Sequence, residues 1–106
     1  MPELDIGTSQ RIDARTAFVH IGTWSLVRVG AKNKLHHQDY IQFEMALENH
    51  PRRIALVQLN RQDLYNIEVG RLKRRSLKWV TEYVQRDVQA ENLSRGIEQA
   101  FEYVMS

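Results

Sequence analysis

The first half of the chain shows a strand-like pattern of apolar residues and then a helical one. Residues 16–32 are rich in β-branched and aromatic residues, which favour strands, and Gly22-Thr23 interrupts them. Because glycine suits the first central position of a type II′ turn, we predict a hairpin that sets Ile21 opposite Trp24. A single strand with a bulge is the alternative. A polar loop follows.

Residues 36–49 change to a helical spacing. Tyr40, Phe43 and Leu47 recur three and four residues apart, which predicts an amphipathic helix. The segment 49–51, Asn-His-Pro, is expected to end this helix. Asparagine accepts a left-handed cap, and the residue before a proline is biased away from helical angles.

Two strands are predicted next. Ile54–Leu59 is apolar on both faces, which is typical of a central strand or one covered on both sides. A polar turn follows over residues 60–63. Leu64–Leu72 then alternates between apolar and polar residues and indicates a half-buried antiparallel strand.

The last third of the chain is predicted to be helical. Ser76 is a candidate N-cap for a helix whose apolar side contains Leu77, Val80, Val84 and Val88. A second segment is expected to begin at Ser94, and its apolar stripe consists of Ile97, Ala100, Phe101 and Val104. A single bent helix is the alternative.

These elements predict an α+β fold in the order ββαββα(α). Its two hairpins would form a four-stranded antiparallel sheet with helices packed on one face, leaving the other face open for binding. Residues 1–15 are expected to be a loose N-terminal arm, with a short helix over 9–15 as one possibility, and residues 16–106 a single domain.

Composition narrows the classes of function. The 106 residues contain no cysteine, which excludes disulfides, thiolate zinc sites and a cysteine nucleophile. No apolar run approaches the roughly 20 residues that span a bilayer, and the acidic first residues do not resemble a signal peptide. We therefore expect a cytoplasmic protein that does not enter a membrane.

Positive charge gathers in one part of the chain. The formal net charge is +2, but residues 52–78 carry +6 and the rest −4. The predicted binding surface consists of eight cations: Arg52, Arg53, Arg61, Arg71, Lys73, Arg74, Arg75 and Lys78. Such a segment suits an acidic protein surface or nucleic acid, although a solvated basic face without a partner has the same composition. Tyr65 and Trp79 flank it and are candidates for stacking on bases; core packing is the alternative.

No motif for catalysis or cofactor binding is present. The chain lacks a P-loop, a glycine-rich dinucleotide fingerprint and a nucleophile elbow. His20, His36, His37 and His50 do not have the spacing of a metal site, so neither a metal nor a cofactor is predicted. The other groups with possible acid, base or nucleophile chemistry are Asp39, Glu44, Tyr65 and Glu68, and no spacing selects among them.

The favoured function is therefore a small non-enzymatic binding protein that uses the basic segment. A protein partner, bound as an inhibitor or adaptor in the manner of phage and plasmid accessory proteins, is slightly preferred. Nucleic-acid binding through the same cations is the alternative, and a histidine–carboxylate hydrolase or nuclease ranks third. The apolar C-terminal helix is also a candidate for homodimer formation.

Overall fold

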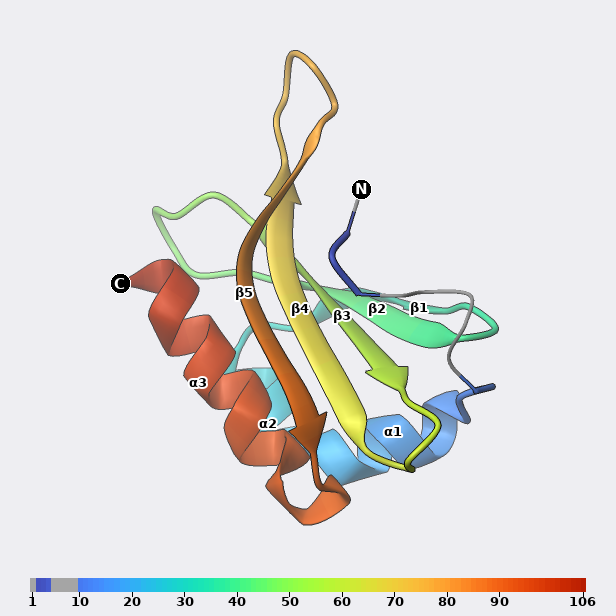
Figure 1. Cartoon of the computed structure of the whole chain (residues 1–106). Helices are drawn as coiled ribbons and strands as arrows, with labels where there is room; N and C mark the ends of the chain where they lie inside the picture. The colour runs from blue at the N-terminus through green and yellow to red at the C-terminus, as the bar shows by residue number, and fades with distance from the viewer. Residues whose placement is uncertain (1, 5–9) are drawn as a thin grey trace.

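The computed structural model describes residues 2–4 and 10–106 (Figure 1). Its elements in chain order are α1 (Ala14–Ile21), α2 (Thr23–Arg28), β1 (Lys32–His36), β2 (Tyr40–Met45), β3 (Arg53–Leu59), β4 (Tyr65–Leu72), β5 (Trp79–Val88), the 3₁₀ turn η1 (Ala90–Asn92) and α3 (Leu93–Met105). The predicted α+β class with an antiparallel sheet is confirmed. The predicted strand number and element order are wrong, because the described chain forms five strands in the order β1-β2-β3-β4-β5.

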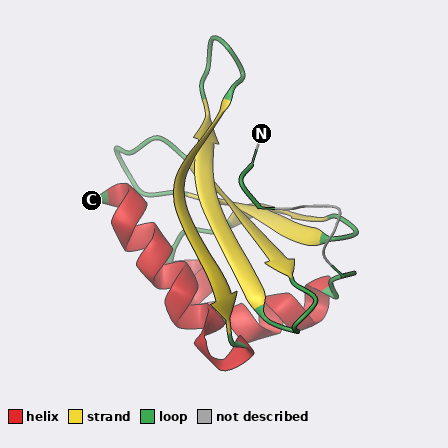
Figure 2. Cartoon of the chain, viewed as in Figure 1, coloured by secondary structure: helices red, strands yellow, loops and turns green. Residues whose placement is uncertain are grey.

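The helices lie together on one face of the sheet (Figure 2). Helix α3 packs against β4, β5, α1 and α2, and α1 also reaches β2. Helix α2 is fixed to α3 by the hydroxyl of Ser25, which bonds Ser94 Oγ at 2.5 Å and Glu98 Oε2 at 2.7 Å. Arg28 forms an ion pair with Glu98 at 3.0 Å. The core lies between this helical layer and the sheet, and its fully buried large side chains include Ile21, Ile41, Phe43, Met45, Ile67, Leu93 and Ile97.

The hairpin predicted over residues 16–32 is wrong, because this segment forms α1 and α2. The carboxylate of Asp13 accepts the N–H groups of Arg15 and Thr16 at 3.0 and 3.4 Å and caps α1. Ala17 and Ile21 lie four residues apart on the buried side of the helix. Gly22, at φ +89°, separates α1 from α2 instead of turning a hairpin.

The helix predicted over residues 36–49 is also wrong. Tyr40–Met45 is strand β2, in which Ile41, Phe43 and Met45 are buried and the intervening side chains face the other side. The burial therefore has a period of two. Asn49 does adopt a left-handed conformation, at φ +67°, but it does so in the turn between β2 and β3.

The two strands predicted in the middle of the chain are confirmed as β3 and β4. They pair antiparallel, with Ala55 opposite Val69 and Val57 opposite Ile67 on the helix-covered face. The turn between them is organised by Asn60, whose side-chain oxygen accepts the N–H groups of Gln62 and Leu64 at 2.9 and 3.1 Å.

The helix predicted to start at Ser76 is wrong, whereas the final helix is confirmed as α3. Trp79–Val88 is strand β5, which pairs with β4 and contains irregularities in its register. Ser76 and Leu77 lie in the turn between these strands, and Leu77 has φ +53°. Val80, Val84 and Val88 therefore belong to a bulged strand and Leu77 to the turn before it, instead of forming one helical stripe.

Residues near the N-terminus occupy part of the sheet face opposite the helices. The backbone N–H groups of Glu3 and Leu4 donate to the carboxylate of Glu68 at 3.0 and 2.9 Å, and Leu4 is only 4% exposed. This part of the face predicted to be open is therefore covered. The predicted loose arm and the possible helix over 9–15 fall partly on residues 1 and 5–9, which lie outside the described residues. Among the described helices, none is long and apolar enough to cross a membrane.

Candidate binding surface at the tip of the β4–β5 hairpin

Strands β4 and β5 form a hairpin whose tip extends beyond the rest of the molecule (Figure 1). We call residues Leu72–Lys78 the hairpin tip. It is closed by two backbone hydrogen bonds, from Lys73 N–H to the Lys78 carbonyl at 2.9 Å and from Leu77 N–H to the Lys73 carbonyl at 2.8 Å. The tip contains four cations, Lys73, Arg74, Arg75 and Lys78, and no acidic residue. The fold thus projects a concentrated positive charge into solvent.

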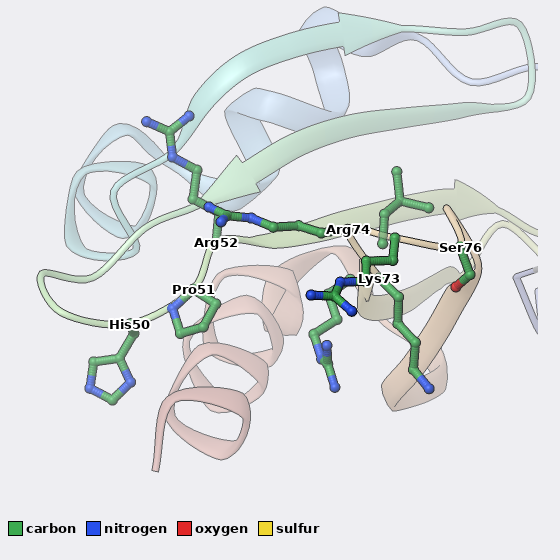
Figure 3. Close-up of a pocket in the computed structure, with 9 residues that line it drawn as sticks. His50, Pro51, Arg52, Lys73, Arg74 and Ser76 are labelled. Carbon is green, nitrogen blue, oxygen red and sulfur yellow. The ribbon is translucent and has the colours of Figure 1, made fainter.

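A hollow of about 930 Å³ lies between the hairpin tip and the loop that leads into β3 (Figure 3). Its charged lining consists of Arg52 from the loop and Arg71, Lys73, Arg74 and Arg75 from the hairpin. The remaining lining residues are His50, Pro51, Leu72 and Ser76, so no carboxylate lines the hollow in the described part of the chain. Because like charges repel one another, an anion entering this hollow is attracted by several cations and also reduces their mutual repulsion.

Two of these arginines are positioned by carboxylates outside the hollow. Arg52 Nη1 lies 3.1 Å from Glu44 Oε1, and Arg71 Nε lies 3.4 Å from Glu82 Oε2. The other oxygen of Glu82 pairs with Arg53, which does not line the hollow. The hydrogen bond from Asn33, followed by that from Arg52, holds the pKa of Glu44 below its usual value.

The four cations of the tip differ from Arg52 and Arg71 in that no carboxylate of the described residues pairs with them. Lys73, Arg74, Arg75 and Lys78 are exposed, and their side chains make no ion pair or hydrogen bond with the described residues. The eight predicted binding residues are therefore divided by the fold into paired and unpaired groups. Arg61 lies in the turn at the opposite end of β4, about 25 Å along the strand from the tip, since a strand rises about 3.3 Å per residue.

Neither of the two aromatic candidates is fully exposed at the surface. Tyr65 is 4% exposed on the helix-covered face, where its hydroxyl lies 2.8 Å from His20 Nδ1; burial, followed by the charge of Asp13, raises its pKa. Trp79 lies at the base of the hairpin and is partly exposed. Its indole N–H lies 2.8 Å from both Glu68 Oε2 and Thr81 Oγ1.

The candidate catalytic groups are dispersed. His20 approaches Tyr65 on the helix-covered face, whereas Glu68 points to the opposite face, because residues of opposite parity along a strand face opposite ways. Glu44 is paired with Arg52, and Asp39 lies in the turn between β1 and β2. Within the described residues no three histidine, aspartate or glutamate side chains gather where they could hold a metal ion.

Two exposed leucines of the hairpin tip were missed by the sequence analysis. Leu72 is 49% exposed and Leu77 is 74% exposed. Leu77 lies three residues before Val80 and seven before Val84, and this spacing is typical of the apolar stripe of a helix. The signal that could have identified it is its position among cations, where a leucine has few apolar neighbours to pack against.

No protein-family model, curated protein or solved structure matches this chain.

Proposed function

We propose that this chain is a non-enzymatic nucleic-acid-binding protein that contacts phosphates through the tip of its β4–β5 hairpin. The observation that carries the proposal is the set of unpaired cations Lys73, Arg74, Arg75 and Lys78 on a projecting hairpin. Phosphate contacts supply most non-specific affinity for nucleic acid, and arginine also binds phosphate bidentately.

The adjoining hollow supports the same function. Its cations come from two segments, and the pairing of Arg52 with Glu44 and of Arg71 with Glu82 holds two of them in defined positions. Cations fixed in this way require less ordering when a ligand binds, whereas the unpaired side chains of the tip can adapt to its shape. A two-stranded ribbon is also narrow enough to enter a groove of a duplex.

The test is a fluorescence-anisotropy titration with single-stranded and double-stranded oligonucleotides, using protein whose absorbance ratio shows that it carries no nucleic acid. If the four cations of the tip each neutralise one phosphate, log K should fall with log salt concentration with a slope of about −3 to −4. The variant Arg74→Glu/Arg75→Glu should bind more than about tenfold more weakly, with a slope smaller by about 2.

The matched control is Arg86→Glu/Arg95→Glu. It makes the same change in net charge at exposed arginines of β5 and α3, away from the tip. This control should bind within about threefold of the unmodified protein if the contact is local. Absence of binding, binding that does not respond to salt, or equal losses in both variants would contradict the proposal.

An acidic protein bound as the target of an inhibitor or adaptor is the second candidate. It is favoured by Leu72 and Pro51, which place apolar surface beside the cations of the hollow, as interfaces between proteins do. A stoichiometric protein partner that is captured from a nuclease-treated extract by the unmodified chain, but not by Arg74→Glu/Arg75→Glu, would favour this function.

A further inference from the structure

Leu77 combines two unfavourable features at the end of the hairpin. Its backbone lies in the left-handed region at φ +53°, which leucine rarely adopts, and its side chain is 74% exposed. The hydrogen bond from its N–H to the carbonyl of Lys73 holds this conformation. The side chain gains little from packing within the fold, so its exposure points to contact with a ligand.

The surroundings of Leu77 indicate how it meets that ligand. Arg74, Arg75 and Lys78 are close to it in sequence within the same closed turn, and Leu72 exposes a second apolar side chain where β4 ends. Proteins that kink DNA place an apolar side chain between two base steps from the minor groove while nearby cations bind the flanking phosphates. A projecting ribbon that ends in a leucine among cations has the parts that this mode of binding requires.

Other polyanionic ligands fit the tip less well. Proteins that bind single strands use exposed aromatic rings as stacking platforms, whereas Tyr65 is buried and the indole of Trp79 is held by Glu68. Association with an anionic membrane grows with the apolar area that enters it, and two separate leucines offer little. Three of the four cations of the tip, Lys73, Arg74 and Arg75, also line a hollow instead of lying on a flat face.

We infer that the nucleic acid is double-stranded DNA, and that Leu77 inserts between base steps from the minor groove and bends the duplex. This inference rests on the proposed function, since the cations of the tip supply the affinity. The main effect of Leu77 is to deform the DNA, because its inserted side chain changes the shape of the duplex. The phosphate contacts supply the attraction and position the protein.

The experiment measures affinity and bending on the same duplex of about 30 base pairs, labelled at both ends for energy transfer. The unmodified protein should bend it by roughly 20–90°. Leu77→Asn retains a residue that tolerates the left-handed conformation but removes the apolar side chain. It should bind within about threefold of the unmodified protein and lose most of the bend. Leu77→Met, which keeps an apolar side chain, should retain the bend. Val19→Asn, which removes an exposed apolar side chain from α1, away from the tip, should leave the bend unchanged.

The two proposals fail in different ways. Binding without bending, or a full bend with Leu77→Asn, overturns the proposed insertion of Leu77 between base steps. Either result leaves the proposed phosphate contact in place. Preference for single-stranded oligonucleotides overturns both the choice of duplex and the insertion of Leu77, and leaves the proposed phosphate contact in place. Absence of binding to any oligonucleotide overturns the proposed function itself, and so does a preference for vesicles that contain phosphatidylserine, which assigns the tip to a membrane surface.

Discussion

The indole N–H of Trp79 donates to the carboxylate of Glu68 at 2.8 Å, from one strand of the projecting hairpin to the other. Glu68 is fully buried. The same carboxylate accepts hydrogen bonds from the hydroxyl of Thr81 at 2.5 Å and from the backbone N–H groups of Glu3 and Leu4. A buried carboxyl group is tolerated when its oxygens are well hydrogen-bonded. One carboxylate therefore joins the base of the hairpin to the N-terminal residues that cover the sheet.

Replacing Glu68 by glutamine should destabilise the protein by about 2 kcal/mol. Glutamine keeps the shape of the side chain, but its amide N–H₂ group cannot accept the hydrogen bonds that one carboxylate oxygen accepts. Urea denaturation gives the change in the free energy of unfolding, and amide hydrogen exchange should show that the N–H of Leu4 loses protection. Glu48→Gln, at an exposed glutamate in the turn after β2, is the control and should change stability by less than about 0.5 kcal/mol. Equal stabilities of Glu68→Gln and the unmodified protein would show that these bonds contribute little.

Replacing Gly70 by alanine should also destabilise the protein, by about 2 kcal/mol. An added Cβ would come closest to the carbonyl oxygen of Val80 and would lie 2.6 Å from Cζ2 of Trp79, so both the strand backbone and the ring must move. The change should cost less in a Trp79→Ala background, since part of the clash is then absent. Denaturation of the two single variants and the double variant gives this coupling. Strict additivity would mean that the indole does not limit the space at residue 70.

Replacing Leu77 by asparagine should make the protein more stable by about 0.5–1 kcal/mol, because asparagine tolerates φ +53° better than leucine. For a chain of this size the midpoint of thermal unfolding should rise by roughly 2–8 °C. Ser76→Asn, at the neighbouring exposed residue, whose φ is not positive, is the control and should leave the midpoint nearly unchanged. A fall in the midpoint with Leu77→Asn would mean that the leucine side chain stabilises the turn by contacts that outweigh its backbone strain.

The stability of the protein should depend on the ionisation of Glu44 in acid. Its pKa is held below the ordinary value of 4.5, first by the hydrogen bond from Asn33 and then by Arg52. Because the folded pKa is the lower one, the resulting stability is present above about pH 4.5 and is lost as the pH falls through the folded pKa. Glu44→Gln should therefore show a shallower loss of stability in acid, measured as urea midpoints over a series of pH values. An unchanged slope would contradict this assignment.

The local sequence pattern was sufficient to predict the secondary structure of a segment where neighbouring segments did not decide it. Ile54–Leu59 and Leu64–Leu72 read as strands because their composition and alternation agree with the positions they occupy in the sheet. The stripe that contains Ile97 and Ala100 likewise indicated α3, and both residues are fully buried. In these segments propensity, periodicity and burial point to one answer.

Elsewhere local preferences conflicted with tertiary structure. The β-branched residues of 16–32 favoured strands, but the cap at Asp13 and the burial of Ala17 and Ile21 favour a helix. In Tyr40–Met45 a period of two was present together with a helical spacing that extended to Leu47. When a short segment satisfies both periods, its pairing with distant strands decides its secondary structure. The sequence alone does not show this pairing.

The candidate surface could be predicted only in part. The run from Arg71 to Lys78 was recognisable from charge, and the fold brings Arg52 to the same hollow. The pairing of Arg71 with Glu82 depends on the register of β4 and β5, and the burial of Tyr65 depends on the position of α1. Such relationships form only when distant segments pack, so the paired and unpaired cations could not be distinguished beforehand.

The contact of Ser25 with Ser94 and Glu98 has a consequence for the order of folding. Each strand of the sheet pairs with its neighbour in sequence, so the sheet can assemble by successive hairpins, whereas α2 and α3 meet only after about 70 residues have been brought together. We expect the helical layer to close after the main folding barrier. Ser25→Ala should then accelerate unfolding and leave the folding rate nearly unchanged in stopped-flow experiments.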